Sequence, residues 1–245
     1  MVLLLAGGTL VKLAATGASM RYVRAGMRPV VLTAGLVLLA VAALSLAHAV
    51  RARRTANAAL AGELGGGDQV GEHGDRHDHG HRFEVAWLLV VPMLVLLLLA
   101  PQPLGSYSAA RAGTALGAAR STDFVPLPAG DPIRVSLLDY AARAVFDPRA
   151  LAGRHVVLSG FVLPGPHGAW YLTRMVITCC AADAQPIKVG LSGTVPAGLR
   201  SNDWIEVTGG YTSRTATDEV NAETIPFIEV NTSRPIAAPS EQYVS

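Results

Sequence analysis

Charged residues are scarce in this 245-residue sequence, at 16%, whereas apolar residues reach 51%. Ordinary soluble domains carry about 25% charged residues. This composition excludes a disordered chain and does not favour a wholly soluble globular protein. The chain has only two cysteines, and because they are adjacent they cannot form the framework of a disulfide-stapled mini-protein. It also lacks a G-x-S-x-G, Walker or H-E-x-x-H motif, so the sequence predicts no enzyme.

The few charges are unevenly placed. Residues 1–120 hold 11 Lys and Arg against 6 Asp and Glu, whereas residues 121–245 hold 9 against 12. A basic, apolar half followed by a mildly acidic half indicates a membrane anchor and a water-facing domain. We therefore expect an α+β protein, in which N-terminal transmembrane helices precede a small, mostly β domain.

Three apolar stretches predict three transmembrane helices. They cover about residues 2–18, interrupted by Lys12, then residues 30–47, and finally residues 83–102. A helix rises about 1.5 Å per residue and the hydrocarbon core is about 30 Å thick, so stretches of this length nearly span it. For the second and third stretches the alternative is a buried core helix. The first two helices and their short basic loop make up residues 1–50.

The Lys and Arg residues of the loops do not decide the orientation, because either orientation places five of them on each side of the membrane. We expect the N-terminus inside the cell and the C-terminal domain outside it. This expectation rests on analogy with metal-cation transporters, whose His-rich loops are usually cytosolic.

Residues 51–82 form a His-rich loop between the second and third predicted helices. Four of the chain's seven histidines lie in it, at His73, His77, His79 and His81. Neutral imidazole is a good ligand for zinc, nickel or copper, and in an extended chain the last three of these rings project from one face. The loop therefore either binds a transition-metal ion such as zinc in an exchangeable way or is a solvated linker with no dedicated role.

The rest of the chain predicts a linker over residues 103–121 and a folded domain over residues 122–240. Ser136-Leu137-Leu138-Asp139 predicts a capping box at the start of a helix that ends at Asp147-Pro148. Five strands are expected after it, over residues 155–163, 170–179, 186–191, 204–208 and 226–230. Short strands separated by glycine turns favour an OB-like β-barrel. We expect no nucleic-acid binding, because this half is net acidic and has no basic stripe.

Cys179-Cys180 ends the second predicted strand, with Asp183 close behind. Neighbouring side chains of a regular strand point to opposite faces, so the two thiols could hold one metal ion only if the chain turns there. Three interpretations stay open: two small hydrophobic residues in the core, a metal site that includes Asp183, or a redox pair. Arg174, in the same strand, would lower a thiol pKa if it lay close in space.

Several segments carry a resemblance to a known family. The most specific is Cys179-Cys-Ala-Ala-Asp183 within residues 172–186, and it is supported by residues 22–29, Pro103-Leu-Gly105, Leu137-Leu-Asp-Tyr140 and Val207-Thr-Gly209. These segments resemble the YcgQ-like, DUF1980-type family of bacterial membrane proteins. The resemblance implies a multi-pass protein of the bacterial plasma membrane that acts with a separate multi-spanning permease, and it implies no substrate and no catalytic residue.

We therefore expect an accessory subunit of a permease, in contact with the lipid bilayer and with its permease partner, that handles a transition-metal ion such as zinc. A membrane-tethered thiol redox protein using Cys179 and Cys180, or a purely structural tether, are the alternatives. Small residues of the first helix let helices approach closely and are the expected contacts with the partner, together with Lys12. They are Gly7, Gly8, Ala14, Ala15 and Gly17.

Overall fold

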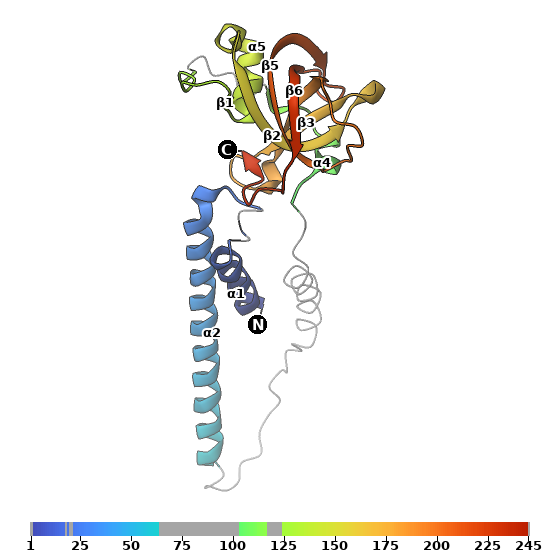
Figure 1. The fold of residues 1–245 in the computed structure, drawn as a ribbon. Helices are drawn as coiled ribbons and strands as arrows, with labels where there is room; N and C mark the ends of the chain where they lie inside the picture. Colours follow the sequence, from blue (N-terminus) through green and yellow to red (C-terminus); the bar gives the residue numbers. More distant parts are fainter. Residues whose placement is uncertain (1, 18, 20–21, 64–102, 117–123, 245) are drawn as a thin grey trace. The chain divides into compact units, whose positions relative to one another are not determined.

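The computed structural model describes the chain apart from residues 1, 18, 20–21, 64–102, 117–123 and 245. The chain divides into two compact units, one made of Met1–Ser19 and Gly26–Pro101 and the other of Met20–Ala25 and Gln102–Ser245. The described part of the first unit is helical and the second is mostly β (Figure 1). The expected α+β class is therefore confirmed.

Within the described residues the helices and strands have the following bounds. The helices are α1 (Val2–Ala15), α2 (Arg28–Glu63), α4 (Ser106–Arg111) and α5 (Leu137–Phe146), and the 3₁₀ turns are η2 (Ala25–Met27), η4 (Pro148–Leu151), η5 (Pro166–Gly168) and η6 (Ala181–Asp183). The strands are β1 (Ile133–Arg134), β2 (His155–Pro164), β3 (Trp170–Val176), β4 (Gln185–Gly193), β5 (Trp204–Thr217), β6 (Thr224–Pro235) and β7 (Tyr243–Val244).

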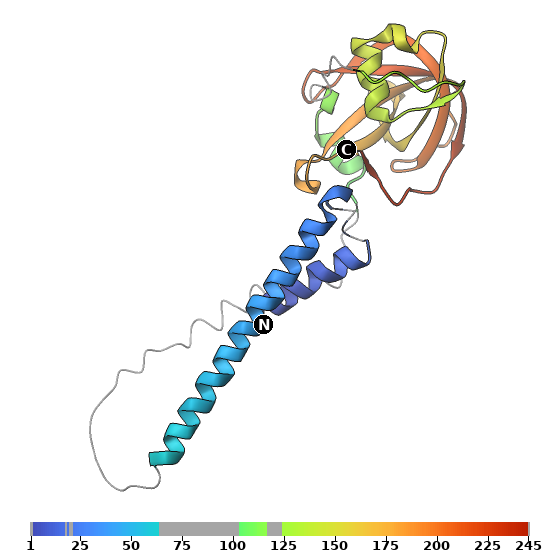
Figure 2. The same ribbon diagram turned by 90° about the vertical axis from the view of Figure 1, so that its left-hand side faces the viewer.

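Helices α1 and α2 pack against each other at a pair of glycines (Figures 1 and 2). A Cβ atom on Gly7 would lie 2.9 Å from the carbonyl oxygen of Gly35 and 2.9 Å from Cγ of Leu39, so only glycine allows this approach. A Cβ atom on Gly8 would meet nothing within 4 Å. The sequence predicts Gly7 as a contact with a partner protein; in the structure this residue lies against α2.

One helix among the described residues, α2, is long and apolar enough over Arg28–Thr55 to cross a membrane. Helix α1 has 14 residues, about 21 Å of helix, which is short of the hydrocarbon core of about 30 Å. The third predicted helix lies outside the described residues. The expectation of three transmembrane helices is therefore supported for one helix only.

The first part of the predicted His-rich loop is helical. Helix α2 continues to Glu63, because residues 51–63 are rich in alanine and arginine, which favour helix. The four histidines of the loop lie outside the described residues.

The second unit is built on a seven-stranded sheet in the order β1-β2-β5-β6-β4-β3-β7, with an additional pairing of β2 with β3. Neighbouring strands therefore run from β2 through β5, β6, β4 and β3 and back to β2. The β4–β6 pairing is parallel, and the other four pairings of this cycle are antiparallel. These five strands are the five that the sequence predicts, although β5 and β6 are longer and β3 ends three residues earlier.

Helix α5 covers the inner core of the sheet. Half of its predicted capping box is confirmed, because the Ser136 hydroxyl accepts a hydrogen bond from the backbone N–H of Asp139 at 3.0 Å, whereas the Asp139 carboxylate accepts a hydrogen bond from Arg143. The buried apolar residues beneath α5 form one cluster. Its members alternate along the strands and include the apolar face of α5. Prominent members are Leu137, Tyr140, Ala141, Leu158, Val162, Leu172, Ile187, Val189 and Ile228.

A second apolar cluster lies under α4, which is on a different side of the strands from α5 (Figures 1 and 2). The sequence predicts a linker over residues 103–121, but residues 104–116 belong to the folded domain. Ala109 is fully buried and Leu116 is 1% exposed. Some of the small residues that suggested a linker are therefore core residues, namely Ala109 and Ala115.

Candidate functional site

The chain turns sharply after β3 ends at Val176, over residues 177–183, which we term the thiol turn. The Asp183 carboxylate organises it by accepting hydrogen bonds from the backbone N–H groups of Thr178 at 2.9 Å, Cys179 at 2.8 Å and Cys180 at 3.4 Å. The 3₁₀ turn η6 follows directly. The predicted strand therefore stops before it reaches the cysteines.

This turn brings the two thiols to the same side. Their sulfur atoms are 3.6 Å apart, and both cysteines are free. The two sulfurs and one Asp183 oxygen all lie within 4.8 Å of one another. No other group of three His, Cys, Asp or Glu side chains among the described residues is placed to hold a metal ion in this way. Because Cys179 is exposed, the interpretation of two buried hydrophobic residues does not fit.

The carboxylate also sets the charge of the site. A hydrogen bond to Asp183, and then the contact with Cys180, raise the pKa of Cys179 to about 12, since a thiolate beside a carboxylate is unfavourable. Hydrogen bonds from the Cys179 side chain and from the backbone of Thr178 and Cys179 lower the pKa of Asp183 to about 2. At neutral pH the turn therefore holds a neutral thiol at Cys179 beside a charged carboxylate.

Arg174 contacts other groups. Its guanidinium donates to the Glu241 carbonyl at 2.9 Å and lies 5.2 Å from the centre of the Trp204 ring. The pKa of Cys179 is raised rather than lowered, so the thiol activation predicted from Arg174 is not found.

The sequence does not predict that the short segment Tyr22–Arg24 contacts the thiol turn. Val23 and Cys180 form an antiparallel bridge. The Arg24 N–H donates to the Cys179 carbonyl at 3.2 Å, and the Ala181 N–H donates to the Tyr22 carbonyl at 2.6 Å. The segment belongs to the same compact unit as the thiol turn, although in sequence it lies shortly before α2.

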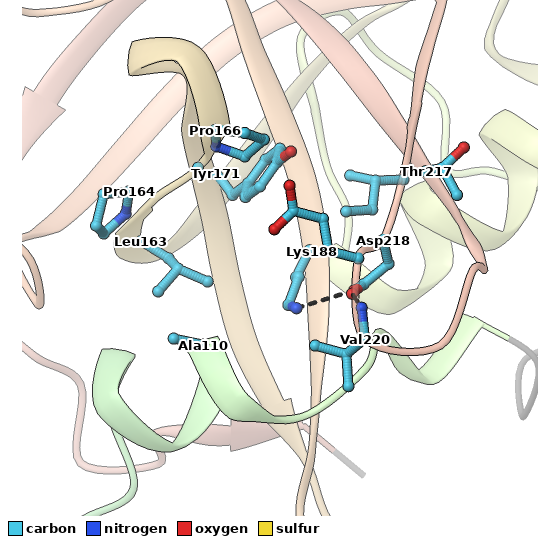
Figure 3. A pocket seen from close by; sticks show the side chains of 12 residues that line it. Ala110, Leu163, Pro164, Pro166, Tyr171, Lys188, Thr217, Asp218 and Val220 are labelled. Carbon is cyan, nitrogen blue, oxygen red and sulfur yellow. Dashed lines mark hydrogen bonds and ion pairs between the residues drawn. The ribbon is translucent and has the colours of Figure 1, made fainter.

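A second feature missed from the sequence is a buried ion pair at a pocket of about 260 Å³ beside α4 (Figure 3). Lys188 Nζ lies 2.9 Å from Asp218 Oδ2, and the two side chains are only 5% and 2% exposed. Lys188 Nζ also donates to the Ala112 carbonyl, and Asp218 accepts the N–H of Thr114, both at 2.9 Å. The pair therefore ties the segment after α4 to the sheet.

The sequence does carry a signal for this pair. Lys188 lies between Ile187 and Val189 in the middle of an apolar strand, and a buried ammonium group needs a partner. Its carboxylate partner comes from the β5–β6 connection, which strand patterns do not predict. Because the two charges neutralise each other, a structural role for this ion pair is favoured over ligand binding.

Comparison with known families assigns the chain to a family independently of the structure. Residues 1–115 match the DUF1980 N-terminal domain, and residues 140–245 match the DUF1980 C-terminal domain. The chain belongs to the DUF1980 family. This confirms the resemblance drawn from the motifs. No curated protein and no solved structure matches the chain. In this DUF1980 protein the thiol turn falls in the C-terminal match, while Tyr22–Arg24 falls in the N-terminal match.

Proposed function

We propose that this protein is a membrane-anchored accessory subunit of a permease, and that it binds a transition-metal ion such as Zn²⁺ through Cys179, Cys180 and Asp183. The single observation that carries the proposal is the approach of the two sulfurs to 3.6 Å in a turn organised by a carboxylate. In this proposal the metal ion is the cargo of the permease system.

The sulfur spacing suits a tetrahedral ion. With Zn–S bonds of about 2.3 Å, sulfurs 3.6 Å apart subtend about 103° at an equidistant ion, close to the tetrahedral angle of about 109°. A linear two-sulfur site with the same bonds would need a separation of about 4.6 Å, so the geometry favours zinc-like coordination.

The ligand set also suits exchange of the ion. Two thiolates and one carboxylate would leave a fourth tetrahedral position open, as in zinc sites that bind a further group. Because the pKa of Cys179 is raised, the ion must displace a proton from this thiol. Binding should therefore weaken as the pH falls, which permits capture and release.

Two architectural proposals accompany this function. We infer that the strand cycle of the second unit is an OB-like barrel; its support is the order β2-β5-β6-β4-β3 and the single parallel pair in it. We also infer a multi-pass protein of the bacterial plasma membrane with its C-terminal domain outside the cell. The apolar surface of α2 and the family resemblance support the membrane anchor, and the side of the C-terminal domain rests on the analogy with metal-cation transporters.

The histidines at 73, 77, 79 and 81 are proposed as a second, weaker metal site, separate from the one formed by Cys179, Cys180 and Asp183. Ordering a loop around an ion costs conformational entropy, so its affinity should be modest. Calorimetry of a peptide covering residues 68–83 should detect zinc at pH 7.5, and no heat above that of the buffer would remove this site.

The experiment on the thiol turn uses the full-length protein in detergent, loaded with ZnCl₂ and desalted, with bound zinc counted by mass spectrometry. The variants are Cys179→Ser, Cys180→Ser and a protein with all four loop histidines changed to alanine. We expect one tightly held zinc ion in the wild type and in the histidine variant, and its loss in either serine variant. Cobalt(II) loading should give thiolate charge-transfer absorption in the wild type and in the histidine variant, and should not give it in either serine variant.

The outcomes separate the alternatives. Absence of zinc and cobalt in the wild type would overturn the metal proposal. A reversible disulfide between Cys179 and Cys180 in that protein would then support a thiol redox function instead. Two unreactive thiols would support a structural tether.

A further inference from the structure

We propose that Tyr22–Arg24 is a positioning segment of the metal site, so that docking of this segment on the thiol turn and metal binding by Cys179 and Cys180 strengthen each other. The inference rests on the metal-binding function proposed above and concerns how that site is regulated. It matters because α2, which among the described helices is long and apolar enough to cross a membrane, begins at Arg28.

The contacts of the segment lie on either side of Cys180. The Cys179 carbonyl accepts the Arg24 N–H, and the Ala181 N–H donates to the Tyr22 carbonyl. These two groups belong to the residues before and after Cys180, which is itself bridged to Val23. The segment therefore fixes the backbone that carries both sulfurs.

The opposite edge of the same backbone is held by Asp183. Its carboxylate accepts the N–H groups of Thr178, Cys179 and Cys180. The thiol turn is thus held on one edge by a carboxylate and on the other by a segment that is distant in sequence. If either edge is released, the sulfur spacing of 3.6 Å is no longer imposed on the turn. An undocked turn would have to order itself when it binds the ion, which lowers affinity.

Thermodynamic linkage makes the effect reciprocal. If docking of Tyr22–Arg24 raises the metal affinity by some factor, the bound ion raises the docking equilibrium by the same factor. One backbone hydrogen bond is worth about two- to tenfold in an equilibrium constant. Metal occupancy is thereby communicated to Arg24, shortly before α2 begins.

The test compares Arg24→Pro with Arg24→Ala in the full-length protein in detergent. Proline removes the N–H that donates to the Cys179 carbonyl, whereas alanine keeps this N–H and removes only the side chain. Val23 already lies in an extended bridge, which is the conformation that a following proline favours. We expect Arg24→Pro to weaken Zn²⁺ affinity by about two- to tenfold in chelator competition, and Arg24→Ala to change it less than about twofold.

A second measurement does not depend on the proline variant. Hydrogen exchange of the wild-type protein should show slower exchange at the Arg24 and Ala181 amides when Zn²⁺ is added, and no such change in Cys179→Ser. If zinc binds the thiols but these amides exchange at an unchanged rate, and both Arg24 variants bind equally, the inference is wrong and the metal function stands. If the wild type binds no zinc at the thiols, the inference and the proposed function fail together.

Discussion

The hydroxyl of Tyr243 accepts a hydrogen bond from the backbone N–H of Leu104 at 3.1 Å. Burial raises the pKa of Tyr243, with a smaller contribution in the same direction from nearby Tyr22. One side chain in the C-terminal strand β7 therefore holds the backbone at Leu104. The other segment that leads to the helical unit, Tyr22–Arg24, is held by the thiol turn.

The first prediction concerns this hydroxyl. Tyr243→Phe keeps the ring but leaves the partly buried Leu104 N–H without its acceptor, which should lower the free energy of unfolding by about 1–2 kcal/mol. Denaturant unfolding of the full-length protein, followed by tryptophan fluorescence, measures the loss. Tyr107→Phe is a suitable control, because Tyr107 is 71% exposed and should change stability little. Equal stability of the two variants would contradict the assigned role.

The second prediction concerns the buried ion pair. Lys188→Met leaves the Asp218 carboxylate buried without its counter-charge, and we expect a loss of about 3–5 kcal/mol in the free energy of unfolding. The double variant Lys188→Met, Asp218→Asn restores neutrality while the amide oxygen can still accept the Thr114 N–H. It should therefore be more stable than Lys188→Met alone. Denaturant unfolding measures both, and a double variant less stable than the single one would contradict the structural role.

The third prediction concerns the contact of α1 with α2. Gly7→Val places side-chain atoms against the Gly35 backbone and should destabilise the helix pair by about 1–3 kcal/mol. Gly8→Val, one position along the same helix, meets open space and serves as the matched control. Thermal unfolding of the two full-length variants in one detergent should give a lower midpoint for Gly7→Val. Identical midpoints would mean that the helices do not meet at Gly7.

Features set by neighbouring residues can be predicted from the sequence. The Ser136 cap and helix α5 depend on contacts three or four positions apart, and both predictions are confirmed. The five main strands also follow from local patterns. One boundary is predicted wrongly, because Gly209-Gly210 indicates the end of the strand predicted over residues 204–208. In the structure β5 continues through a bulge there, and a Cβ atom on Gly209 would lie 2.2 Å from the Glu229 carbonyl oxygen.

Features set by distant residues cannot be predicted in this way. The bridge between Val23 and Cys180 joins residues 157 positions apart, and no local signal marks it. The thiols and the carboxylate are therefore recognisable as ligands from their types, while the contact of the thiol turn with Tyr22–Arg24 comes only from the fold.

The fourth prediction is an acid dependence. The pKa of Asp183 is about 2 in the folded protein, against an ordinary value of 3.8. A carboxylate with a lowered pKa stabilises the fold fully above its ordinary pKa, and this contribution is lost as the pH falls towards 2. Wild-type protein should therefore be more stable than Asp183→Asn at pH 6, and the difference should disappear near pH 2. Denaturant unfolding at both pH values measures it; a difference that is constant with pH would contradict the assignment.

The fifth prediction concerns thiol reactivity. Since Asp183 is the largest cause of the raised pKa of Cys179, Asp183→Asn should move that pKa down from about 12 towards its ordinary value of 9.0. The thiolate is the reactive form, so alkylation of Cys179 by iodoacetamide at pH 8.5 should be at least about tenfold faster in the variant. The alkylation rates with Asp183 and with Asn at this position are both measured in a Cys180→Ser background, which leaves one cysteine in the chain. Arg174→Lys in the same background should leave the rate unchanged, because Arg174 contacts Glu241 and Trp204 instead. Equal rates with and without the Asp183 carboxylate would show that it does not control the pKa of the Cys179 thiol, and the strong competition between protons and the metal ion would then lose its cause.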